Sequence, residues 1–70
     1  MRMISLIRKI DNDENPDMHI VVGFTDAGEY FTRWYKNIID LQCSEPNIFL
    51  KRRVKCFWFN PKVNTLLIEV

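Results

Sequence analysis

The apolar residues in the middle of the chain recur with a helical period. Between residues 27 and 41 they occupy positions 27, 30, 31, 34, 35, 38, 39 and 41, a spacing that gathers them on one side of an α-helix. Asp26 and Glu29 fit a capping box at the start, and Pro46 requires the helix to end by about Ser44. The pattern predicts a helix that places Trp34 in the hydrophobic core. Truncation of Trp34 to alanine should then lower the free energy of unfolding by roughly 3–5 kcal/mol.

The same segment admits a second interpretation. Residues 25–29 can form a hairpin turn, and the aromatic and β-branched residues that follow favour strands. The chain would then be a five-stranded all-β barrel. We favour the helix because polar and apolar residues after Glu29 come in pairs, whereas a half-buried strand shows strict alternation.

The segments on both sides of this helix have the character of β-strands. Strands are predicted over residues 2–10, 18–24, 48–59 and 63–70, with an acidic loop over 11–17 and a turn over 60–62. The most regular alternation is that of residues 18–24. The expected fold is α+β: a small antiparallel sheet in ββαββ order with one amphipathic helix packed on one face.

Length and composition limit the class of protein. Seventy residues make a single domain, 1–70, with a core near the lower limit of independent stability, and an apolar content of 47% argues against disorder. The longest apolar runs are too short to span a membrane, and the N-terminal residues do not resemble a signal peptide. We therefore expect a cytoplasmic protein with no membrane association.

The residues that usually carry chemistry are few and scattered. Cys43 and Cys56 lack the closely spaced partners of a zinc site, so we expect free thiols and no metal. His19 is the only histidine, and two glycines cannot form a phosphate-binding loop. The sequence thus predicts no enzymatic activity, no cofactor and no small-molecule substrate.

One side of the predicted long strand combines aromatic and basic residues. The odd positions from 51 to 59 are Lys51, Arg53, Lys55, Phe57 and Phe59, and alternation places them on the sheet face that the predicted helix leaves open. An apolar patch rimmed by positive charge is more than a monomer normally exposes to water. We expect these five residues to bind a partner.

Three interpretations fit this basic and aromatic strand. It can bind a protein, either a different one or a second copy in a homodimer; it can bind single-stranded nucleic acid through base stacking; or its cations can protect a sheet edge from aggregation. A net charge of only +1 favours protein over nucleic acid. The function expected is therefore a non-enzymatic interaction module of the adaptor or inhibitor type, with nucleic-acid binding as the alternative.

Overall fold

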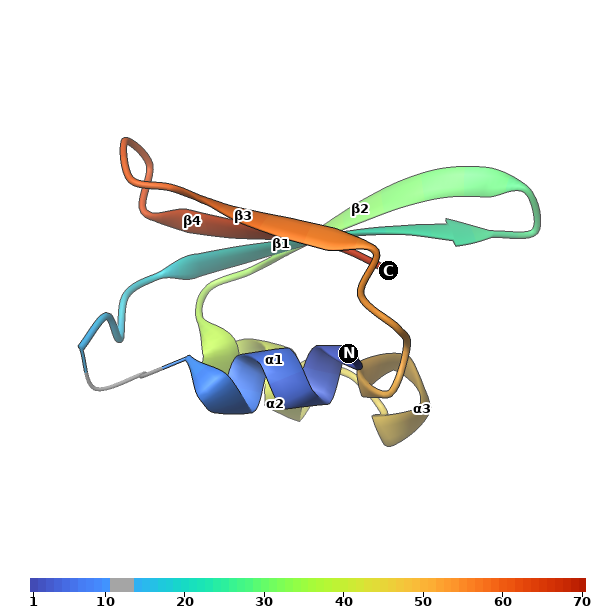
Figure 1. The fold of residues 1–70 in the computed structure, drawn as a ribbon, viewed down its shortest axis with the longest axis horizontal. Helices are drawn as coiled ribbons and strands as arrows, with labels where there is room; N and C mark the ends of the chain where they lie inside the picture. Colours follow the sequence, from blue (N-terminus) through green and yellow to red (C-terminus); the bar gives the residue numbers. More distant parts are fainter. Residues whose placement is uncertain (11–13) are drawn as a thin grey trace.

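The computed structural model describes residues 1–10 and 14–70, and in these residues three short helices cover one side of a four-stranded sheet (Figure 1). The helices are α1 (Met3–Lys9), α2 (Ile38–Ser44) and α3 (Asn47–Leu50). The strands are β1 (His19–Asp26), β2 (Glu29–Tyr35), β3 (Cys56–Asn60) and β4 (Thr65–Glu69). Across the sheet the order is β2-β1-β4-β3, so β2 and β3 are the edges.

The α+β class predicted from the sequence is confirmed, but the ββαββ order is wrong. The order along the chain is αββααββ, and the sheet is mixed, because β4 is antiparallel to its hairpin partner β3 and parallel to β1. The alternative of a five-stranded barrel is also wrong, since the described strands form an open sheet of four. The prediction failed because α1 was taken for a strand and β2 for a helix.

The segment predicted as one long helix divides into a strand and a helix. Ala27 and Gly28 both have positive φ, 50° and 80°, as a two-residue type I′ hairpin turn requires, and they join β1 to β2. The turn of the second interpretation is therefore the one observed. Because β2 is an edge strand whose residues 29–34 stay exposed, its apolar side chains are not confined to alternate positions.

The helical part of that segment begins eleven residues later than the capping box predicted. Asn37 caps α2: its Oδ1 accepts the backbone N–H of Asp40 at 2.8 Å. The carboxylate of Asp40 accepts in return from the backbone N–H of Lys36 at 2.9 Å. Asp26 and Glu29 instead face each other as the last pair of the β1–β2 ladder.

The first predicted strand is the helix α1. Met3, Leu6 and Ile7 are buried, and their spacing brings them to one side of a helix. The chain before α1 is tied to the segment after α3, since the N–H of Met3 donates to the carbonyl of Arg52 and the N–H of Val54 to that of Met1, both at 2.8 Å.

The other predicted elements are partly observed. The strand over 18–24 corresponds to β1 and that over 63–70 to β4, whereas the long strand over 48–59 contains α3, a connecting segment and only then β3. A turn over 61–64 joins β3 to β4. Of the acidic loop predicted over 11–17, residues 11–13 lie outside the described residues.

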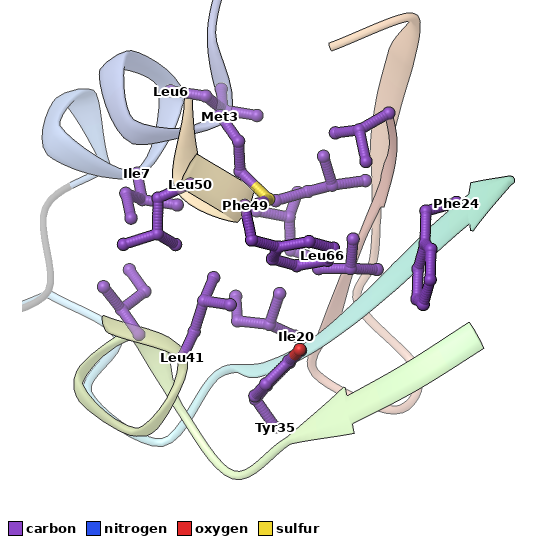
Figure 2. Close-up of a cluster of buried hydrophobic side chains, with 14 of the residues drawn as sticks. Met3, Leu6, Ile7, Ile20, Phe24, Tyr35, Leu41, Phe49, Leu50 and Leu66 are labelled. Carbon is purple, nitrogen blue, oxygen red and sulfur yellow. The ribbon is translucent and has the colours of Figure 1, made fainter. Parts of the chain in front are cut away.

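The hydrophobic core lies between the helices and the sheet (Figure 2). Its members are Met3, Leu6, Ile7, Met18, Ile20, Val22, Phe24, Tyr35, Ile38, Leu41, Phe49, Leu50, Leu66, Ile68 and Val70. Every described element except β3 contributes to it, because all five side chains of β3 are exposed or half-buried. The core therefore holds β3 only through its pairing with β4.

These positions reverse the expectation for Trp34, whose side chain is 60% exposed. Trp34→Ala should lower the free energy of unfolding by less than about 1 kcal/mol, the usual range for a surface site. Leu41→Ala, which truncates a fully buried side chain of α2, should cost about 2–5 kcal/mol. Urea denaturation of both variants checks the pair, and a loss for Trp34→Ala as large as that for Leu41→Ala would contradict the fold.

Candidate interaction surface

The strand register assigns each side chain of the sheet to one of its two faces. Directly paired residues share a face, so Phe57 and Phe59, which pair with the buried Ile68 and Leu66, point to the side of the helices. They remain 48% and 44% exposed because the helices do not cover this edge. The sequence-based assignment of both phenylalanines to the helix-free face is wrong.

The three basic residues of the predicted site lie outside the strand. Lys51 is the C-cap of α3, Arg53 forms an isolated bridge with Arg2, and Lys55 immediately precedes β3. Alternation begins only at Cys56, so the cations and the phenylalanines do not form one continuous face. The three cations also lie outside the edge strand that they were expected to protect from aggregation, because β3 itself carries no charge.

A different row of side chains crosses the open face of the sheet. Trp34 pairs with Val21, Val21 with Leu67, and Leu67 with Trp58, so one residue from each strand contributes. Trp34 is 60% and Trp58 49% exposed, and no helix covers this face (Figure 1). We call these four residues the Trp row. The sequence analysis missed it, because it placed Trp34 in the core and assigned the open face to the odd positions 51 to 59 of the long strand.

Tyr30 extends the apolar surface beside the Trp row. Its ring crosses the backbone at Gly23, where an added Cβ would lie 2.2 Å from the Tyr30 hydroxyl oxygen. The hydroxyl donates to Glu69 at 2.8 Å, and this hydrogen bond to a carboxylate raises the pKa of Tyr30. Gly23 in the interior of a strand was the sequence signal for such a close approach.

His19 orients the exposed Trp34. The two ring centroids are 5.3 Å apart with planes tilted by 40°. His19 is itself held by a contact of 2.8 Å between its Nδ1 and the carbonyl oxygen of Lys36. The end of the Trp row at β2 is therefore fixed by a neighbour on β1.

Positive charge gathers on the opposite side of the sheet from the Trp row. Arg33 pairs with Val22 on the helix side, and its guanidinium lies 5.1 Å from the ring centroid of Phe24. Arg52 reaches the same cluster, 5.3 Å from Phe49. Within the four strands, the positions on the open face carry the carboxylate of Glu69 and no lysine or arginine.

Glu45 organises this basic cluster. Its carboxylate accepts from Arg33 at 2.9 Å and from the hydroxyl of Tyr35. Burial, followed by the hydrogen bond to Glu45, raises the pKa of Tyr35 well above its ordinary value. The partner carboxylate likewise raises the pKa of Arg33. These groups link β2 to the end of α2.

The remaining features of the described residues concern metal ligands, thiols and hollows. In the part of the chain that the structure describes, no three His, Cys, Asp or Glu residues cluster closely enough to hold a metal. Cys43 and Cys56 are free and exposed. A hollow of about 160 Å³ near the hairpin tip has Asp26 as its one carboxylate. No helix in residues 1–10 and 14–70 is long and apolar enough to cross a membrane.

Comparison with known proteins adds no family to this description. The chain matches no protein-family model, and neither the curated proteins nor the solved structures contain one that is significantly similar. Function must therefore be argued from the surface itself.

Removing the acceptor of Tyr30 tests the geometry of the open face. In Glu69→Gln the pKa of Tyr30 should fall toward its ordinary value, because the charged hydrogen-bond acceptor that favours the neutral phenol is lost. Gly23→Ala should act in the same direction by displacing the ring. The two tyrosine ring signals can be followed by NMR across alkaline pH, with Tyr35 as internal control. An unchanged pKa of Tyr30 in Glu69→Gln would contradict the contact.

Proposed function

We propose that this chain is a non-enzymatic interaction module that acts by binding another protein molecule, either a different protein or a second copy. The observation that carries the proposal is the Trp row with its exposed ends, Trp34 and Trp58. Two tryptophans around an aliphatic centre, on the sheet face away from the helices, form the kind of anchor that dominates binding energy at protein interfaces.

The distribution of charge favours a protein over a nucleic acid. Binding of single strands requires cations beside the stacking aromatics, so that phosphates are neutralised as bases stack. Here Arg33 lies on the helix side of the sheet, and Arg52 stacks on core phenylalanines. The strand positions of the open face combine the apolar Trp row with a single carboxylate and no lysine or arginine, which suits the apolar patch of a protein partner.

The proposal is tested by comparing Trp34→Ser with Ile48→Ser. Both remove an exposed apolar side chain, but Ile48, 81% exposed, lies on α3 in the helical layer. Wild type and both variants are immobilised and exposed to extract of cells that produce the protein, and the recovered partner is then titrated in purified form. Trp34→Ser should weaken its binding about tenfold or more, the effect of losing a tryptophan anchor.

Ile48→Ser should bind the purified partner as tightly as wild type. Equal affinity of Trp34→Ser and wild type would refute the open face as the binding surface. A gel shift with single-stranded oligonucleotides that disappears as salt rises would instead support the nucleic-acid alternative.

A further inference from the structure

We infer that two copies of this chain also pair with each other, with β3 of one copy antiparallel to β3 of the other on a two-fold axis through Trp58. This inference goes beyond the proposed function, because the contact uses Trp58 of the Trp row and leaves Trp34, on the opposite edge strand β2, available to another protein. The two sheets would join at their β3 edges into one sheet of eight strands, a β-augmentation in which backbone groups pair across the axis.

The exposure of three consecutive aromatic residues indicates an added strand. Phe57, Trp58 and Phe59 are 48%, 49% and 44% exposed. Neighbouring residues of a strand point to opposite faces, so Trp58 lies on the open face and the two phenylalanines on the helix side. A partner resting on either face covers only part of this set. A strand beside β3 borders both faces and reaches all three.

The aromatic side chains of β3 differ from those at the other edge of the sheet, because within residues 1–10 and 14–70 they make no aromatic pair, cation contact or side-chain hydrogen bond. At the other edge, Trp34 packs against His19, Phe31 stacks on Phe24, and Tyr30 donates to Glu69. Among the described residues, no aromatic pair or stacked cation involves any side chain of β3. Because β3 also adds nothing to the core, its run of aromatics is not explained by the fold of one chain.

The sequence of β3 is complementary to itself. The strand reads Cys-Phe-Trp-Phe-Asn, so an antiparallel pair centred on Trp58 sets the two tryptophans opposite each other. Each Phe57 then faces Phe59 of the other copy, giving two aromatic cross-strand pairs on the helix side. None of the five residues is charged, so no like charges oppose each other within the paired stretch. Such a two-fold contact joins the same surface of both copies, so the assembly stops at the dimer.

The experiment replaces the two phenylalanine pairs by charges of chosen sign. In Phe57→Lys/Phe59→Lys, lysines face lysines twice across the axis, and the dissociation constant of the dimer should rise roughly tenfold or more. In Phe57→Lys/Phe59→Glu, each lysine faces a glutamate, and dimerisation should recover relative to the double lysine variant. Sedimentation equilibrium at several concentrations, with thermal melts to verify folding, follows the mass between 8.4 kDa and twice that value.

A cross-link tests the register independently. In the proposed pair Cys56 faces Asn60 of the other copy, whereas residues 56 and 60 of one chain lie about 13 Å apart along the strand. Asn60→Cys in a Cys43→Ser background, oxidised by air, should therefore give a disulfide-linked dimer. Cys43→Ser alone should give none, because its two Cys56 thiols lie at opposite ends of the contact.

The β3 pairing and the proposed function can fail independently of each other. A wild type that stays monomeric up to millimolar concentration, or a double lysine variant that dimerises as well as wild type, would overturn the β3 pairing. If Trp34→Ser still abolished capture of a different protein in that case, the proposed function would stand with another partner.

Discussion

The parallel pairing of β1 with β4 is the constraint on which the rest of the molecule depends. It places the buried Ile20 and Val22 beside Leu66 and Ile68, and these four side chains form the apolar layer against which all three helices pack. The helices are seven, seven and four residues long, too short to be stable alone in water. They exist because this layer covers their apolar sides. Of the two outer strands, β2 adds Tyr35 to the core, whereas β3 is held only by its pairing with β4.

The central strands could be predicted from the sequence and the outer ones could not. β1 and β4 each bury one face, so their apolar residues alternate, whereas β2 and β3 bury almost none of their side chains and show no sorting. The segment of α1 was the avoidable error, since Met3, Leu6 and Ile7 already had helical spacing. Strand order and register bring residues 21, 34, 58 and 67 together as the Trp row. Neither can be predicted from the spacing of apolar residues within a single segment.

The same register explains why the sequence suggested one basic and aromatic face where two surfaces exist. Lys51, Arg53 and Lys55 precede β3. Strand alternation cannot assign them to the face of Phe57, because the chain between α3 and β3 is not a strand. Two other arginines contact aromatic rings: the guanidinium of Arg33 lies over Phe24 and that of Arg52 over Phe49, at the edge of the core. Their charges lie on that side of the sheet, and the strand positions of the open face carry no lysine or arginine.

An open sheet has two edges, and the difference between them decides which assembly of copies closes on itself. β2 carries Glu29 and Arg33, and Arg33 is held by Glu45. β3 carries no charge. Pairing β3 of one copy with β2 of the next is a heterologous contact, which would extend without limit. Pairing β3 with β3 instead buries the uncharged edge of both copies and leaves only their charged β2 edges exposed. A closed pair is therefore the assembly in which the least protected edge of this sheet is no longer available for further growth.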